Sequence, residues 1–405
     1  MPEGTIDLRS GLTVWRAKHG PPRYFSPLLN DASCEVVIIG GGITGALIAW
    51  ELVQIGVDCI LIDQSTIGGG STSASTALLL YELDTPMAEL AGQLGEDDAV
   101  ACYLACRDAI GKIRNVTDEL GNDCGFRIRA SYYLAEHPSH VEGLMEECSL
   151  RRKHGMNVEW LRGQEIGERF SFNRPGAILS REAAEVDVIQ LVDVLIERSI
   201  ERGVRVYAES PMASFRETVK GVSVRLDCGC EVNASKAVFA TGYESERYLG
   251  RRLGLLKSTY AIATSPITEF TGWHERSLLW TSARPYLYLR TTDDRRAVVG
   301  GGDIDYHDPI SRDALLQAKA AELETSFRSM FPLLDCEIEC AWAGTFGETK
   351  DSLAYIGTPA ERPSTYFALG YGGNGIVYSV IAAEIIRDLY RGVPNDAARL
   401  FRFGR

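Results

Sequence analysis

The chain has 405 residues, of which 45% are hydrophobic and 24% are charged. These fractions fit a globular protein of two or three structural units and exclude a disordered chain, a collagen and a coiled coil. Asp and Glu outnumber Lys and Arg by 55 to 42, a net charge of −13 at pH 7. Nucleic acid is therefore not an expected partner, because phosphate binding needs clustered Lys and Arg.

The polar residues 1–34 contain Pro21, Pro22 and Pro27, and we expect them to form a leader on the surface. They show no secretory signal pattern. The longest uncharged run, 36–50, has 15 residues, fewer than the ~20 of a membrane span. With ten cysteines that form no CxxC and six scattered histidines, we expect reduced thiols, no metal site and a cytoplasmic protein.

The next segment predicts a nucleotide-binding βαβ unit. An apolar strand over 34–40 leads into Gly40-Gly-Gly-Ile-Thr-Gly45, a helix to about residue 55 and a second strand over 59–63. Gly40 permits a tight turn, Gly42 lets the backbone approach a pyrophosphate, and Gly45 lets the helix pack closely on the sheet. Asp63 is placed to accept ribose hydroxyls, and the helix N-terminus favours an anion.

Three later segments favour FAD over NAD. Residues 67–77 are small and hydroxylic, 238–242 end a strand in Ala240-Thr241-Gly242, and 371–375 are rich in glycine before a final helix. The N-terminus of that helix would favour the negative charge of a reduced flavin. The alternatives are a flexible loop at 67–77 and a simple helix N-cap at Asn374.

Periodicity predicts the other elements of the chain. Helices are expected over 87–120, 141–154, 190–202, 312–330 and 375–390. Strands are expected over 126–135, 204–207, 212–215, 221–226, 236–240, 257–265, 286–290, 297–301 and 366–369.

Six segments in order resemble the FAD-dependent D-amino acid oxidase superfamily, on the branch with glycine oxidase, monomeric sarcosine oxidase and γ-glutamylputrescine oxidoreductase. The resemblance covers about residues 20–392. The segments that carry it are 37–45, 67–70, 238–242, 260–264, 341–344 with 349–351, and 369–376.

The resemblance implies an α/β fold with a Rossmann-like FAD-binding domain and an interleaved substrate domain on a mostly antiparallel sheet. The implied FAD-binding domain comprises 35–86, 181–250 and 341–392, and the substrate domain 87–180 and 251–340. The implied residues around noncovalent FAD are Gly40, Gly42, Ile43, Thr44, Gly45, Asp63, Gln64, Ser71, Thr72, Ser73, Thr76, Met212, Ala240, Thr241, Gly242, Gly344, Gly372, Gly373, Asn374, Gly375 and Ile376. Asp63 replaces the usual Glu, and the loop 70–77 lacks the family's Arg and later glycines.

The family's chemistry implies oxidation of the C–N bond of a small amine or amino acid by hydride transfer to flavin N5, giving an imine that hydrolyses. Arg290 matches a carboxylate-binding Arg, since guanidinium binds carboxylate through two hydrogen bonds. Tyr288 and Tyr260 would add hydroxyl contacts. Val298 stands where sarcosine oxidase-like members use a Lys for O2, so the electron acceptor is O2 or another molecule. The alternatives are an NAD-dependent dehydrogenase and a non-catalytic flavin-binding subunit.

Overall fold

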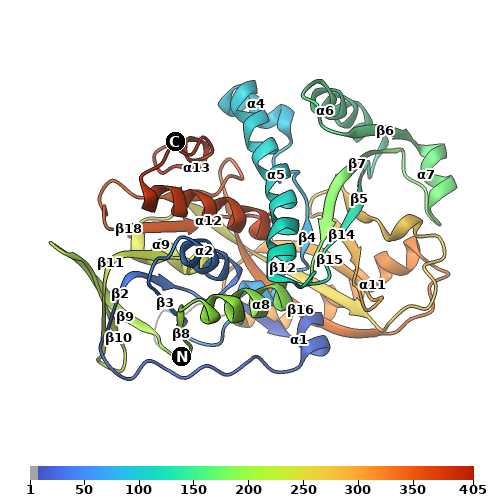
Figure 1. The fold of residues 1–405 in the computed structure, drawn as a ribbon. Coiled ribbons are helices and arrows are strands. Elements are labelled where there is room, and N and C mark those ends of the chain that lie inside the picture. Colours follow the sequence, from blue (N-terminus) through green and yellow to red (C-terminus); the bar gives the residue numbers. More distant parts are fainter. Residues whose placement is uncertain (1–7) are drawn as a thin grey trace.

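The computed structural model describes residues 8–405 and contains two sheets joined side by side (Figure 1). The eight-stranded sheet has the order β17-β18-β11-β2-β3-β8, and β9 and β10 extend from β11. Its strands are β2 (Ala32–Ile39), β3 (Cys59–Ile62), β8 (Arg205–Tyr207), β9 (Met212–Thr218), β10 (Gly221–Leu226), β11 (Glu231–Phe239), β17 (Tyr355–Gly357) and β18 (Thr365–Leu369). Strands β18, β11, β2, β3 and β8 run parallel.

Helices cover one face of this parallel core, as buried parallel sheets require. Helix α2 (Ile43–Gln54) packs against α8 (Val188–Glu201) and α12 (Gly375–Arg391), and α12 also contacts α5 (Glu96–Leu120). The β9–β10 hairpin belongs to the other face, where Val222 and Val224 join one apolar cluster with Val37 and Phe239. The predicted βαβ unit is therefore confirmed, with β2 and β3 buried between two layers.

The second sheet has ten strands in the order β1-β16-β12-β15-β14-β13-β5-β7-β4, with β6 beside β7. Its strands are β1 (Arg9–Gly11), β4 (Leu78–Leu79), β5 (Arg127–Leu134), β6 (Val158–Arg162), β7 (Gly176–Glu185), β12 (Gly254–Thr264), β13 (Leu278–Thr281), β14 (Leu287–Thr291), β15 (Ala297–Asp305) and β16 (Ile338–Thr349). All pairs are antiparallel except β5 with β13, so this sheet is mixed.

The remaining helices surround the two sheets. They are α1 (Val14–His19), α3 (Ser71–Ala74), α4 (Met87–Leu94), α6 (Val141–Lys153), α7 (Gly163–Arg169), α9 (Ser245–Leu249), α10 (Pro309–Ala314), α11 (Leu316–Met330) and α13 (Ala398–Phe401). Helix α11 lies against β12, β15 and β16 and buries Leu323, Phe327 and Met330.

The described part of the leader differs from the expectation of a surface strap. Strand β1 pairs with Trp342 to Gly344 of β16 and so forms one edge of the ten-stranded sheet. Trp15 is 1% exposed, and its indole Nε1 donates to the carbonyl oxygen of Ser75 at 2.7 Å. Burial of so large a side chain anchors this segment to the core.

Two further differences concern the boundaries of predicted helices. The helix predicted over 87–120 divides at Gly95, which has a φ of +89° and separates α4 from α5. The helix predicted over 312–330 is α10 and α11, which divide at Leu315. The domain boundaries predicted at 181 and 341 fall inside β7 and β16, both strands of the ten-stranded sheet.

Within residues 8–405, no helix is both long enough and apolar enough to cross a membrane. Over the same residues, no group of three or more His, Cys, Asp and Glu side chains could hold a metal ion. All ten cysteines are free.

Candidate functional site

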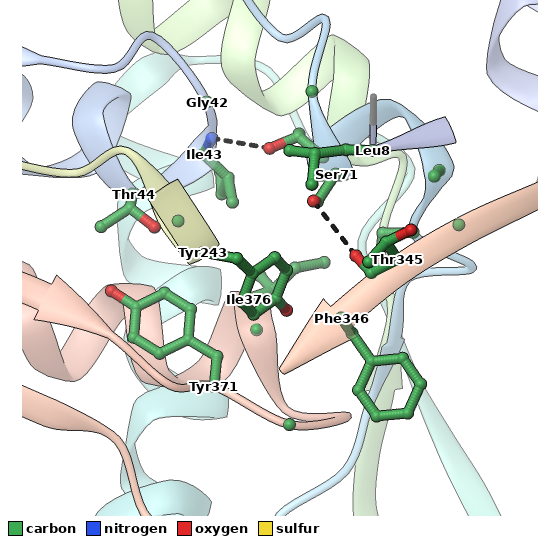
Figure 2. Close-up of a pocket in the computed structure, with 18 of the residues that line it drawn as sticks. Leu8, Gly42, Ile43, Thr44, Ser71, Tyr243, Thr345, Phe346, Tyr371 and Ile376 are labelled. Atoms are coloured by element: carbon green, nitrogen blue, oxygen red, sulfur yellow. Dashed lines mark hydrogen bonds between the residues drawn. The ribbon is translucent and has the colours of Figure 1, made fainter. Parts of the chain in front are cut away.

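The carboxyl ends of the parallel strands meet at one edge of the eight-stranded sheet, the usual position of ligand sites in such sheets. The loops that follow β2, β3, β11 and β18 line one cavity of about 620 Å³ there, a volume within the ~300–1,000 Å³ common for small-molecule sites. Figure 2 shows Ile43, Ser71, Tyr243, Thr345 and Tyr371 around this opening. The turns at 40–45 and 371–375 therefore converge, although more than 300 residues separate them.

The turn after β2 is too crowded for side chains. A Cβ atom on Gly40, whose φ is +108°, would lie 2.3 Å from the carbonyl oxygen of Ala240. A Cβ atom on Gly42 would lie 2.9 Å from Thr72 Oγ1. Thr72 also accepts a hydrogen bond from the Ile43 amide at 3.1 Å, which joins the loop 70–77 to the start of α2. The start of α2 thus lies on the cavity wall, with the Ile43 amide bonded to Thr72 and the side chains of Ile43 and Thr44 beside it.

Asp63, at the end of β3, organises the neighbouring backbone. Its Oδ2 accepts a hydrogen bond from the Gly41 amide at 2.7 Å, and its Oδ1 accepts one from the Ser65 amide at 2.8 Å. Burial raises the pKa of Asp63, and these hydrogen bonds oppose that shift. The carboxylate therefore both fixes the turn and lines the cavity.

The glycine-rich loop after β18 is tied to the segment that follows β4. Asp84 accepts a hydrogen bond from the Gly373 amide at 2.9 Å. Asn374 Nδ2 donates to the carbonyl oxygens of Leu80 and Glu82, each at 2.9 Å. Asn374 occupies the N-cap position of α12 but makes no side-chain cap hydrogen bond. The alternative of a simple N-cap is therefore wrong, because this amide connects two loops of the cavity.

Aromatic side chains line the cavity where it meets the ten-stranded sheet. Tyr286 donates a hydrogen bond to the carbonyl oxygen of Asp84 at 3.1 Å, and the Tyr288 hydroxyl lies 3.2 Å from Thr259 Oγ1. Trp280 also lines the cavity and stacks on Tyr133. A Cβ atom on Gly300 would lie 2.2 Å from the Tyr288 ring, so this glycine makes room for Tyr288.

Charged side chains lie in the same region. Asp303 follows the glycines of β15, and its Oδ1 is buried with no hydrogen-bond partner among the described residues. Burial, with the charges of Asp84 and Glu348, raises the pKa of Asp303 to about 6. Lys257 and Arg284 are the basic side chains on the described cavity wall. Lys257 is paired with Asp305 at 2.6 Å.

The structure brings most of the predicted cofactor residues together. Those that line the cavity are Gly40, Gly42, Ile43, Thr44, Asp63, Gln64, Ser71, Thr72, Thr76, Met212, Ala240, Thr241, Gly242, Gly344, Gly372, Gly373, Asn374, Gly375 and Ile376. Gly45 lies behind the turn, packed on Gly40. Ser73 is fully buried and donates its hydroxyl hydrogen bond to the carbonyl oxygens of Gly69 and Gly70.

Of the three predicted substrate residues, only Tyr288 lines the cavity. Tyr260 is 1% exposed, and its hydroxyl donates to the carbonyl oxygen of Arg312 at 3.1 Å. The structure thus places Tyr260 in the core.

Arg290 is also 1% exposed and does not line the cavity. Its Nη1 donates to the carbonyl oxygens of Ala77 at 2.6 Å and Val186 at 2.9 Å, and its Nε donates to that of Thr291 at 2.8 Å. Its Nη2 lies 3.8 Å from Glu185. The guanidinium is therefore used inside the protein, and the structure does not present it to a substrate.

Sequence reasoning missed several cavity residues that come from separate parts of the chain. They are Asp84, Tyr243, Lys257, Trp280, Arg284, Asp303, Phe346 and Glu348. Two of them had a local signal: Tyr243 directly follows the Ala240-Thr241-Gly242 turn, and Asp303 directly follows three glycines.

Residues 35–389 match the FAD dependent oxidoreductase family. The chain belongs to this family. Its members bind FAD, so the protein is an FAD-dependent oxidoreductase, and the resemblance to the D-amino acid oxidase superfamily is confirmed. An NAD-dependent dehydrogenase is correspondingly disfavoured.

Curated relatives align with nearly the whole of this chain. The chain is 27% identical to the glycine oxidase of Bacillus licheniformis over 89% of this chain and 94% of that protein. It is 26% identical to the γ-glutamylputrescine oxidoreductase of Escherichia coli over 94% of this chain and 88% of that protein. It is 24% identical to a putative Rieske 2Fe-2S iron-sulfur protein of Bacillus subtilis over 96% of this chain and 74% of that protein.

Solved structures share the fold of the flavoenzyme. The glycine oxidase of Geobacillus kaustophilus has a TM-score of 0.74 at 20% identity and covers 92% of this chain and 99% of its own. The L-amino acid deaminase of Proteus myxofaciens has a TM-score of 0.77 at 14% identity and covers 98% of both chains.

The cavity of the flavoenzyme fits FAD in three respects. It is continuous from Asp63 and Met212 to the 372–376 turn, so an extended dinucleotide can span it. Gly40 and Gly42 leave the backbone bare where a Cβ would collide. Helices α2 and α12 both begin at the cavity, which places two positive dipole ends toward an anionic ligand.

Proposed function

We propose that the protein oxidises the C–N bond of a small amine or amino acid. The α-C–H bond of the neutral amine breaks and its electron pair leaves as hydride, so the C–N bond becomes the C=N bond of an iminium ion. Loss of the proton on nitrogen gives the imine, and water hydrolyses the imine to a carbonyl compound and the free amine or ammonia. Bound FAD supplies the hydride acceptor. The observation that carries the proposal is the convergence of the 40–45 and 371–375 turns on one cavity that continues to Tyr286 and Tyr288.

We assign the turn after β2 to the cofactor's pyrophosphate. Gly40, Gly42 and Thr44 would meet it at the start of α2, with Ser71 and Thr72 from the facing loop. This assignment is supported by the bare backbone at Gly42 and by the hydrogen bond from Ile43 to Thr72.

The other contacts follow the shape of the cavity. Asp63 would accept hydrogen bonds from the adenosine ribose, and Met212 would lie beside adenine. Gly344 and the 372–376 turn would lie along the flavin ring. No covalent link is expected, because the wall residues Gly344, Thr345 and Phe346 carry no nucleophilic thiol.

The chain's contribution to the reaction is positioning. Tyr286 and Tyr288 are held by Asp84 and Thr259, so their rings form a fixed wall beside the space left for the amine. Holding the α-carbon in a reactive geometry lowers the barrier without a dedicated base. The acceptor that reoxidises the flavin is O2 or another oxidant.

Anaerobic addition of amines and amino acids to the FAD-loaded protein tests the proposal. Bleaching of the flavin by at least one of them is expected, followed by recovery of colour with O2 or with an added artificial acceptor. A protein that binds FAD but is bleached by no member of the panel would be a non-catalytic flavin-binding subunit. A protein that cannot be loaded with FAD would overturn both possibilities.

A cytoplasmic location is a separate part of the proposal. It is supported by ten free cysteines, several of them buried, since disulfides are rare in reducing compartments. Fractionation of cells that carry the protein tests it, and recovery outside the cytoplasm would contradict it.

A further inference from the structure

The charges on the cavity wall near Tyr286 and Tyr288 are predominantly negative. Four carboxylates line this part, and we call them the acidic wall: Glu82, Asp84, Asp303 and Glu348. They come from three places in the chain: Glu82 and Asp84 from the segment after β4, Asp303 from β15 and Glu348 from β16. The cavity is the site of the proposed function, so the charge on its wall bears on which substrates can enter.

Two members of the acidic wall keep carboxylate oxygens without hydrogen-bond partners. Glu82 is 4% exposed, and its Oε2 is buried and unpartnered among the described residues. The Oδ1 atom of Asp303 is also buried and has no hydrogen-bond partner among the described residues. Buried carboxylate oxygens are costly to leave unsatisfied, so these atoms point to a donor that arrives with the ligand.

The basic groups nearby are already engaged. Lys257 lies 2.6 Å from Asp305, which is outside the cavity. Arg284 donates to the carbonyl oxygen of Asp84 at 2.8 Å and lies 3.5 Å from Glu348. Arg151, which does not line the cavity, is shared between Glu82 at 3.2 Å and Glu147 at 2.7 Å. The surplus of negative charge therefore remains on the wall.

A carboxylate on the substrate would meet this surplus. The sequence predicts that Arg290 would bind such a carboxylate. Its guanidinium instead donates hydrogen bonds to main-chain carbonyl groups, and Arg290 does not line the cavity. Phe346 occupies the wall on β16, two residues from Glu348, and offers no charge. Aromatic rings together with carboxylates are instead the usual surroundings of a bound organic cation.

We propose that the substrate is an alkyl diamine or a similar cationic amine without a carboxylate, and that Asp303 and Asp84 hold its second ammonium group while the first amine is oxidised. This inference rests on the function proposed above and names its substrate class. The Tyr286 and Tyr288 rings would enclose the methylene chain between the two nitrogen atoms.

Three ligands of equal chain length test the proposal: the terminal diamine of butane, butylamine, and the terminal aminobutanoate. Each has four carbon atoms, and the fourth carbon carries an ammonium group in the diamine, is a methyl group in butylamine and is a carboxylate in aminobutanoate. With FAD-loaded protein under nitrogen, we expect the diamine to bleach the flavin at concentrations at least ~10-fold lower than butylamine, and aminobutanoate to be the poorest, because one charged hydrogen bond contributes roughly this factor. Equal or better bleaching by aminobutanoate would overturn the proposal.

Binding without turnover gives a second readout. In the dithionite-reduced holoenzyme no hydride acceptor remains, so the three ligands bind without reacting. Calorimetric titration of this form should rank their affinities in the same order as the bleaching. Asp303→Asn should weaken diamine binding by at least ~10-fold and butylamine binding by less than ~3-fold. Asp335→Asn, which removes one exposed carboxylate outside the cavity, is the matched control and should change neither.

The two proposals fail in different ways. If the protein binds FAD and only carboxylate-bearing amino acids bleach it, the proposed function stands and the diamine assignment is wrong. If no amine bleaches the flavin, the proposed function is wrong, and the calorimetric order of the three ligands still decides whether the wall selects cations. Equal affinity of wild type and Asp303→Asn for the diamine would reject the role of Asp303.

Discussion

A Cβ atom on Gly45 would lie 1.9 Å from the carbonyl oxygen of Gly40. Gly40 directly follows β2 and Gly45 lies in the first turn of α2, so this contact sets how closely the helix approaches the sheet. This close packing of α2 on the sheet also places the first turn of the helix at the cavity. Any side chain at position 45 would separate the two elements.

Gly45→Ala should therefore destabilise the protein by about 1–3 kcal/mol, the usual range for an overpacked core, and should weaken FAD binding. Chemical unfolding and flavin absorbance after purification check both effects. The control is Gly111→Ala, at an exposed position of α5 with no atom within 4 Å of the added Cβ. That change should stabilise by up to ~1 kcal/mol, so equal behaviour of the two variants would contradict the packing argument.

Arg290→Ala should act on stability. Removal of the guanidinium leaves the carbonyl oxygens of Ala77 and Val186 and the carboxylate of Glu185 without this partner inside the core. Breaking such a buried arrangement costs about 3–5 kcal/mol. Denaturant unfolding measures the loss. A normally stable variant whose KM rises for carboxylate substrates alone would instead support the role as a carboxylate clamp.

Binding of a diamine should depend on pH through Asp303. Asp303 faces Thr259, Tyr288, Lys257, Asp84 and Glu348, and its pKa is raised to about 6 by burial together with the two neighbouring acids. The carboxylate is charged above this pH and neutral below it, whereas alkyl ammonium groups stay charged throughout. Diamine affinity should therefore fall as the pH drops through about 6, by as much as ~10-fold per unit for binding to the charged form alone.

Calorimetric titrations of the reduced holoenzyme between about pH 5 and 8 follow this change. In Asp303→Asn the affinity should be low and nearly constant over the same interval. If the variant retained the full pH dependence, another carboxylate of the acidic wall would be responsible.

His19 should make stability depend on pH. It lies 2.6 Å from Asp187, whose other oxygen caps α8 by accepting a hydrogen bond from the Gln190 amide at 3.0 Å. The hydrogen bond to Asp187 raises the pKa of His19, so the protonated form stabilises the fold. This contribution is fully present below the unfolded value of about 6.5 and is lost as pH rises through the folded pKa.

His19→Ala should accordingly cost about 1 kcal/mol more at about pH 6 than at about pH 9. Urea unfolding at the two pH values gives this difference. His307→Ala, at an exposed position, is the control and should stay within about 0.5 kcal/mol of wild type at both. A cost for His19→Ala that does not change with pH would mean that packing of the ring, rather than its charge, matters.

The half of the cavity that we assign to the nucleotide could be predicted from sequence because its determinants are local. The apolar run of β2, the glycines at 40, 42 and 45, and the acid ending β3 each follow from backbone geometry within about 30 residues. Parallel strands then place their carboxyl ends at one edge, so the turns after β11 and β18 join the same cavity.

The substrate half depended on tertiary structure. Tyr286, Tyr288 and Arg290 stand at alternate positions of the chain, but alternation gives the face of a strand and not the extent of the cavity over that face. Tyr286 and Tyr288 reach the cavity, whereas the carbonyl groups of Thr76 and Ala77 cover Arg290.

The sequence by itself determined the βαβ unit, the class of cofactor and the family, since each rests on short-range pattern and glycine geometry. Only the tertiary structure decided that Asp84, Asp303 and Glu348 share one wall and that Trp15 belongs to the core. The physical reason is that the charge and burial at a site depend on residues that are distant in the chain. The local periodicity of a sequence does not show which of these residues the fold brings together.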